Sequence, residues 1–141
     1  MQLIPYLNFG GQCREAFAFY RDVFNGEIVG QMTYGESPMC DQMPPDSKPM
    51  IMHCCLQIGD VMLMGADGPP PHAEPGQGTF INISVDTVEE AERLWAALLD
   101  GGEARMPLQE TFWAQRFGML VDRYGKPWMV NCMAAGGGTS E

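Results

Sequence analysis

The sequence is poor in basic residues and has no long apolar run. Its 141 residues include 8 Lys and Arg against 18 Asp and Glu, which gives a formal net charge of −10. A surface of that sign repels polyphosphate, which argues against nucleic acids and anionic membranes as partners. No apolar stretch approaches the roughly 20 residues that a membrane span needs, and the N-terminus lacks a signal-peptide pattern. We therefore expect a cytoplasmic protein.

The chain also lacks the cysteine and histidine spacing of common metal sites. Its two histidines lie far from zinc-finger spacing, and the cysteines form no C-x-x-C pair. There are five cysteines, an odd number: Cys13, Cys40, Cys54, Cys55 and Cys132. They predict free thiols in a reducing compartment. Charged residues make up only 18% of the chain, which favours a surface buried in a second copy and hence a homodimer.

Two segments show the apolar periodicity of amphipathic helices. Residues 12–24 place Ala16, Phe19, Tyr20 and Val23 on one stripe, and residues 88–100 place Ala91, Leu94, Trp95 and Leu98 on another. Residues 87–90 read as a capping box, in which the Thr87 hydroxyl accepts from the Glu90 amide and the Glu90 side chain reaches back.

The two helical segments belong to a repeated pattern. Glu15-Ala16 matches Glu90-Ala91 at a shift of 75 residues. A strand-like run precedes each helix and three more follow it: 3–9, then 28–34, 50–58 and 61–66; and 79–85, then 103–108, 113–122 and 127–133. This duplication predicts an α+β fold of two tandem βαβββ modules in a single domain. We expect module one at 1–66, a linker at 67–78, module two at 79–133 and a flexible tail at 134–141, with a long loop at 35–49.

Several local motifs occur in a characteristic order. They are Pro5-Tyr6-Leu7-Asn8-Phe9, Ala16-Phe17-Ala18-Phe19-Tyr20, Met52-His53, Met106-Pro107-Leu108-Gln109, Thr111-Phe112-Trp113 and Trp128-Met129-Val130-Asn131. Together they resemble the PhnB-like branch of the vicinal oxygen chelate superfamily, which includes glyoxalases, bleomycin-resistance proteins and extradiol dioxygenases. The resemblance implies a curved, cup-like mixed sheet with helices on its outer face, commonly in a homodimer. It does not imply one chemistry, because members of the superfamily run unrelated reactions.

Enzymes of this superfamily usually hold a divalent metal with His or Glu side chains from four strands. The matching positions here are Pro5, Leu63, Phe80 and Met129, and none of them supplies an imidazole or a carboxylate. A thioether is a poor ligand for Mg, Mn or Zn. We therefore expect no metal and no cofactor.

Strand alternation proposes which side chains face the cup. In residues 50–58 the even positions are wholly apolar, so they face the helix and leave His53 to the cup as the candidate catalytic residue. The candidate ligand-binding residues are His53, Cys55, Gln57, Leu63, Phe80, Asn82, Trp113, Met129 and Asn131. The leading hypothesis is a PhnB-like protein that binds a small apolar or aromatic molecule without a metal. Two alternatives stay open. One is a metal-dependent lyase, isomerase or dioxygenase that rebuilds its site from His53 with Asp67 or Glu110, and the other is a drug-sequestering resistance protein.

Overall fold

The structure is a computed structural model that describes residues 1–38, 40–68 and 77–133. It divides the chain into two compact units, Met1–Pro75 and Gly76–Glu141, and each is described by itself. The predicted tail and most of the predicted linker lie outside the described residues. In the described part of the chain, no helix is long and apolar enough to cross a membrane.

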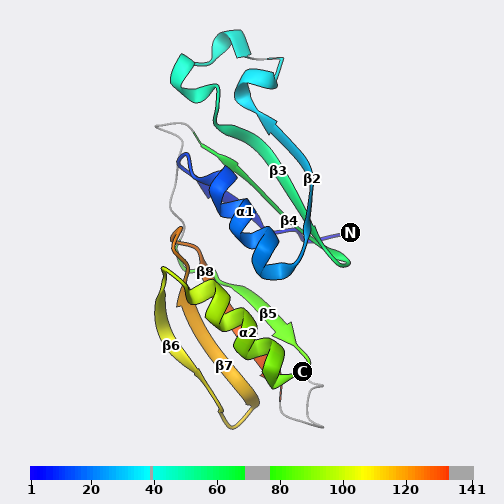
Figure 1. The fold of residues 1–141 in the computed structure, drawn as a ribbon, viewed down its shortest axis with the longest axis vertical. Helices are drawn as coiled ribbons and strands as arrows, with labels where there is room; N and C mark the ends of the chain where they lie inside the picture. The colour runs from blue at the N-terminus through cyan, green and yellow to red at the C-terminus, as the bar shows by residue number, and fades with distance from the viewer. Residues whose placement is uncertain (39, 69–76, 134–141) are drawn as a thin grey trace. The chain divides into compact units, whose positions relative to one another are not determined.

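Each unit contains one α-helix and four strands (Figure 1). In the first unit they are β1 (Tyr6–Phe9), α1 (Cys13–Phe24), β2 (Glu27–Thr33), β3 (Ile51–Ile58) and β4 (Val61–Asp67). In the second they are β5 (Ile81–Val85), α2 (Val88–Leu99), β6 (Glu103–Gln109), β7 (Ala114–Val121) and β8 (Pro127–Met133). The predicted helices and strands are therefore present, with their ends moved by up to three residues.

The two sheets have the same topology. Their strand orders are β1-β4-β3-β2 and β5-β8-β7-β6. The first strand of each unit pairs in parallel with the last, and the other neighbours are antiparallel. The helix after the first strand carries the chain to the opposite edge, from which three antiparallel strands return. The predicted α+β fold of repeated βαβββ modules is confirmed.

Helix α1 packs its apolar stripe on the first sheet. Ala16, Phe17 and Tyr20 are completely buried, and Gly65 in β4 makes room for the Phe17 ring. A Cβ at Gly65 would lie 2.6 Å from Phe17 Cε1, which is closer than packed atoms tolerate. The helix is also joined to β3 by a hydrogen bond between the thiols of Cys13 and Cys54. That bond raises the pKa of Cys13, with burial adding to the rise, and it lowers the pKa of Cys54.

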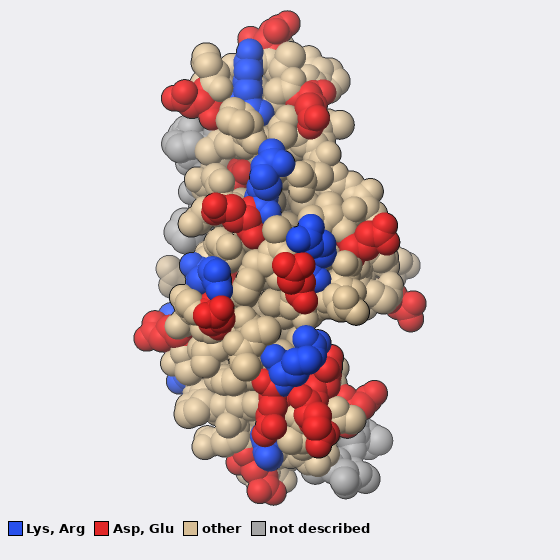
Figure 2. Space-filling view, in the orientation of Figure 1, with Lys and Arg blue, Asp and Glu red and all other residues tan. Residues whose placement is uncertain are grey.

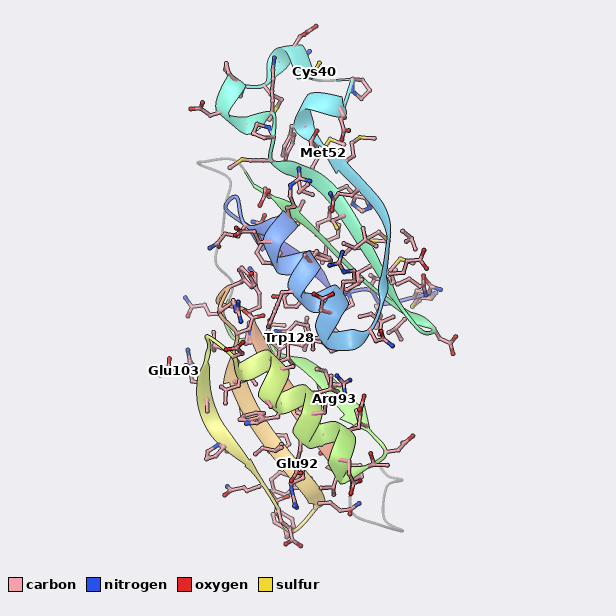
Figure 3. The ribbon with its side chains drawn as sticks, viewed as in Figure 1. Cys40, Met52, Glu92, Arg93, Glu103 and Trp128 are labelled. Atoms are coloured by element: carbon pink, nitrogen blue, oxygen red, sulfur yellow. The ribbon has the colours of Figure 1, made fainter. Side chains whose placement is uncertain are left out.

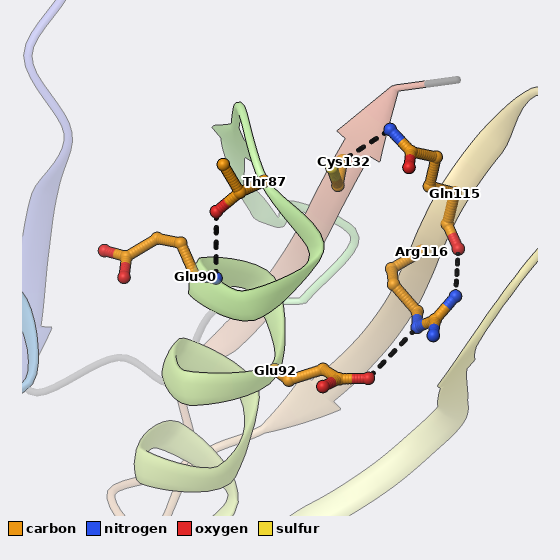
Figure 4. Close-up of polar contacts among 6 residues, drawn as sticks. All are labelled: Thr87, Glu90, Glu92, Gln115, Arg116 and Cys132. Atoms are coloured by element: carbon orange, nitrogen blue, oxygen red, sulfur yellow. Dashed lines mark hydrogen bonds and ion pairs between the residues drawn. The ribbon is translucent and has the colours of Figure 1, made fainter. Parts of the chain in front are cut away.

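Helix α2 begins with only half of the capping box predicted at residues 87–90. The Thr87 hydroxyl accepts the Glu90 amide at 3.1 Å (Figure 4). The Glu90 carboxylate does not close the capping box, because it pairs with Arg93 at 2.9 Å instead. Figure 2 shows acidic and basic side chains side by side over this helix. A second ion pair, Arg116 with Glu92 at 3.3 Å, ties the helix to β7.

The segment between β2 and β3 is longer than its counterpart in the second unit. It contains three short 3₁₀ turns, at Tyr34–Glu36, Cys40–Gln42 and Pro45–Ser47. The Tyr34 hydroxyl donates to the Asp67 carbonyl oxygen at 2.7 Å, which anchors the base of this segment to the end of β4. The predicted long loop is thus partly ordered into turns.

Asp67 corrects the sequence interpretation, which placed it in an exposed linker. It is the last residue of β4 and is 2% exposed. Its carboxylate accepts the backbone amides of Gly11 at 2.8 Å, Cys13 at 3.0 Å and Ile51 at 2.9 Å. Gln12 offers no side-chain cap to α1, so Asp67 supplies from a distant strand the acceptor that a helix start requires.

Replacing Asp67 is expected to destabilise the protein strongly. Asp67→Ala leaves three backbone donors without their acceptor, and we expect a loss of about 3 kcal/mol or more. Asp67→Asn keeps one acceptor oxygen and should lose less. Urea unfolding followed by circular dichroism measures both variants. Asp41→Ala, at an exposed position, is the matched control and should stay within about 0.5 kcal/mol of wild type. Equal stability of Asp67→Ala and the control would contradict the assignment.

Candidate functional site

Each sheet has one face turned away from the helix of its own unit, which we call the helix-free face. In the first unit, Cys54 and Leu56 point toward α1 and are completely buried. Because side chains alternate along a strand, His53, Cys55 and Gln57 lie on the helix-free face. The Cys55 thiol donates to Met62 Sδ on the neighbouring strand, which confirms that these two side chains share that face.

Tyr6 joins His53 on this face. The Tyr6 hydroxyl and His53 Nδ1 lie 3.1 Å apart, and the two rings stand 5.9 Å apart. Partial burial raises the pKa of the Tyr6 hydroxyl, and Cys13, Tyr34 and Cys54 raise it further. The phenol is therefore neutral and can donate to Nδ1, which would place the imidazole proton on Nε2. Cys55 lies on the same strand face as His53, but the structure shows no hydrogen bond between them among the described residues.

The helix-free face of the second unit carries two rows of side chains that cross all four strands. Gly118 marks the opposite face, because a Cβ there would lie 2.7 Å from Trp95 of α2. Trp128, labelled in Figure 3, also faces α2 and is 2% exposed. The strand register then sets the rows. The first row is Asn82, Met129, Met119 and Met106, and the second is Ser84, Asn131, Phe117 and Gln109.

Aromatic rings extend the second row toward the β6–β7 connection. Trp113 lies 5.4 Å from Phe117 and 4.7 Å from Phe112, measured between ring centroids. Trp113 is 40% exposed and Phe112 is 95% exposed. Beside this row Gln115 holds the end of β8, because its amide donates to the Met133 carbonyl oxygen at 2.8 Å and lies 3.8 Å from Cys132 Sγ (Figure 4). The face thus has an aromatic and thioether centre with amides and a hydroxyl around it.

Leu63 does not lie where the sequence interpretation placed it. It pairs with Leu56, is 4% exposed and faces α1. Aligning Gly59 with Gly125, the glycines of the two β-turns, matches Leu63 to Met129. The first hairpin closes on the pair Ile58–Val61 on the helix side, whereas the second closes on Val121–Pro127 on the helix-free face. Aligning the two glycines therefore sets the last strands one residue out of step, and a shift of one residue exchanges the faces of a strand.

The remaining candidates separate into two groups. Asn82, Met129 and Asn131 come together on the helix-free face of the second unit, with Trp113 at its margin. His53, Cys55 and Gln57 lie together in the first unit, and Phe80 immediately precedes β5. Their roles as ligand contacts stay predictions.

Sequence reasoning missed Tyr6, Phe117 and Met119. Alternation within each strand could have signalled them, but β7 has apolar and polar residues at both its odd and its even positions. Nothing in the sequence alone therefore identified which set of β7 side chains faces away from the helix.

The residues present do not fit the divalent metal that the superfamily commonly carries. Among residues 1–38, 40–68 and 77–133, no three His, Cys, Asp or Glu side chains are grouped to hold a metal ion. The last-strand position Met129 is flanked in register by Asn82 and Met119, which offer an amide and a thioether. Asp67 is one of the carboxylates considered above for an alternative metal site. Its carboxylate already accepts hydrogen bonds from three backbone amides.

The comparisons with known proteins agree with this fold. A family model described as 3-demethylubiquinone-9 3-methyltransferase matches residues 1–131. Protein YjdN of Escherichia coli K12 is 32% identical over 139 residues, covering 93% of this chain and 95% of that protein. Protein PA1353 from Pseudomonas aeruginosa has a solved structure with 45% identity, a TM-score of 0.86, and coverage of 94% of this chain and 98% of that one.

A more distant structure shares the architecture. A glyoxalase/bleomycin resistance protein/dioxygenase family enzyme from Burkholderia phytofirmans has 16% identity and a TM-score of 0.63, with 93% of this chain and 97% of that chain covered. That likeness concerns the fold alone. The family match and the more similar relatives show the family, and the distant structure agrees with them on the fold. The chain belongs to the PhnB-like 3-demethylubiquinone-9 3-methyltransferase family, which has the fold of the glyoxalase/bleomycin resistance/dioxygenase superfamily.

Proposed function

We propose that this protein binds a small, largely apolar or aromatic molecule on the helix-free face of its second unit, without a divalent metal. The observation that carries the proposal is the pair of cross-strand rows, in which Met119, Met129 and Phe117 form the centre. Thioethers adapt to the shape of an apolar ligand, and aromatic rings pack against flat ones. The surrounding amides would orient the ligand, as polar groups commonly do in apolar sites.

Methyl transfer is not supported by the residues present, despite the description of the family. Nucleotide-binding folds commonly hold their ligand at a glycine-rich turn whose backbone amides are free. The Gly10-Gly11 turn before α1 does not offer them, because the amides of Gly11 and Cys13 are already donated to Asp67. We therefore favour binding over methyl transfer and derive no step through such a donor.

We also propose that the chain forms a homodimer in the cytoplasm. Each sheet has two edge strands that are paired on one side only within their own unit, and an open edge can pair with another chain. The edge strands β2 and β6 carry exposed apolar side chains, at Val29, Met32 and Met106. The five cysteines are all free thiols, which supports a reducing compartment.

Removing the aromatic centre should weaken binding of an apolar aromatic probe. We expect methoxynaphthalene to bind saturably, and Phe117→Ala to weaken it roughly tenfold, because an aromatic contact is lost. Isothermal titration calorimetry gives the affinities, and chelator should leave them unchanged. Val61→Ala removes an exposed apolar side chain from the first unit, outside the proposed site, and serves as the control. Equal weakening in both variants, or no saturable binding to the wild type, would reject the site.

The protein purified without an affinity tag and without added metal should carry far less than one metal ion per chain. The reason is the donor set, since thioethers and amides hold Mg, Mn and Zn poorly. Elemental analysis by mass spectrometry measures the content directly. About one tightly held Mn, Fe, Ni or Zn per chain would refute the metal-free proposal and favour the enzyme alternative.

Sedimentation should show a species of twice the chain mass of 15.6 kDa at micromolar concentration. Introducing charge at an edge strand, as in Met106→Glu, should shift the species toward the monomer, because a buried charge in an interface is costly. Asp60→Glu, which preserves charge in the β3–β4 turn, is the control. A wild-type monomer throughout that concentration range would contradict the proposed homodimer.

A further inference from the structure

We propose that the molecule bound on the helix-free face of the second unit carries a neutral hydrogen-bond donor on an aromatic ring, of the phenol class, which Asn131 Oδ1 accepts. This inference rests on the proposed function and names the class of ligand. The observation behind it is the Asn131 carbonyl oxygen. It is shielded from solvent and meets no hydrogen-bond donor among the described residues.

The orientation of the Asn131 amide follows from its neighbours. Its nitrogen Nδ2 lies 3.2 Å from Met133 Sδ and 3.5 Å from Ser84 Oγ. A thioether sulfur accepts hydrogen bonds and cannot donate them, so it favours the nitrogen at that end of the amide. The oxygen is thereby directed to the side where no described residue donates.

A buried acceptor without a donor destabilises a fold, and nearly all such groups in native proteins are paired. Exceptions to local rules of this kind are expected at functional sites, where a ligand completes the pairing. A bound hydroxyl would supply the missing donor once the atoms that shield this oxygen in the free protein move aside. The stability given up in the free protein would then be recovered on binding.

The surroundings of Asn131 specify what carries the donor. In register beside it is Phe117, whose ring lies 5.4 Å from Trp113. The adjoining row contributes the thioethers of Met129 and Met119. All eight side chains of the two rows are uncharged, so nothing in them compensates an ammonium or a carboxylate. A neutral hydroxyl on a flat apolar ring fits these neighbours best.

The test compares naphthol with its methyl ether, methoxynaphthalene, on the full chain. The two probes share the ring, and only naphthol donates a hydrogen bond. We expect wild type to bind naphthol roughly fivefold more tightly, the effect of one neutral hydrogen bond. Asn131→Leu should bind both probes equally. Gln42→Leu removes an exposed amide from the first unit, outside the proposed site, and should keep the wild-type preference.

A second measurement uses the protein without any probe. If Asn131 Oδ1 is unpaired, Asn131→Leu should unfold at the same urea concentration as wild type or at a higher one. A clearly lower midpoint would mean that the amide is already satisfied within the protein, and would overturn the inference.

The outcomes separate this inference from the proposed function. Equal binding of both probes to wild type overturns the donor requirement and leaves the proposed function standing. A naphthol preference that persists in Asn131→Leu also overturns it, since another group would then be the acceptor. Failure of both probes to bind wild type rejects the proposed function and the inference with it. Loss of the preference in Asn131→Leu alone, with the ether still bound, supports both.

Discussion

The buried carboxylate of Asp67 joins three segments of the first unit at one point. It accepts amides from the turn before α1, from the first turn of α1 and from the start of β3. The direction of the helix across the sheet depends on that junction, and so does the division of the sheet into a helix side and a helix-free face. Asp122 plays a related part in the second unit, where it is 3% exposed and accepts two turn amides and the Trp128 indole. Each unit thus has a buried aspartate, at the end of its last strand in the first unit and in the turn before its last strand in the second.

The helices and the duplication were predictable because their signals are local. A 3.6-residue apolar period and a threonine cap at Thr87 can be read within short windows, and the shift of 75 residues between the helices follows from comparing two such windows. Asp67 shows where such reading stops. Its amide partners on α1 and the preceding turn are 54 and 56 residues away in the sequence, so no window around it reveals that it is buried. A charged residue beside a proline-rich stretch looks exposed until the fold brings its partners to it.

The candidate site was predictable to the extent that one strand face could be told from the other. In β3 the even positions are all apolar, so His53 and Cys55 could be placed opposite the helix from the pattern alone. The partnership of Tyr6 with His53 depends on β4 lying between their strands, which is a property of the sheet order. The unpaired oxygen of Asn131 likewise emerges only when Ser84 and Met133 are seen to take the other end of its amide. Sequence patterns can therefore show which face of a strand a side chain lies on. Which side chains meet on that face depends on the order and register of the strands in the sheet.

The two hairpin turns have a consequence for how such a duplicated protein can change over generations. Two residues connect Ile58 to Val61, whereas five connect Val121 to Pro127, and the closing pairs lie on opposite sides of their sheets. Each half therefore has an independent means of altering which side chains a ligand meets. An insertion or deletion in one turn can present the other set of residues along a whole strand, with no substitution in the strand itself. In a duplicated chain, the strand faces of one half could be exchanged in this way while the other half keeps the original arrangement.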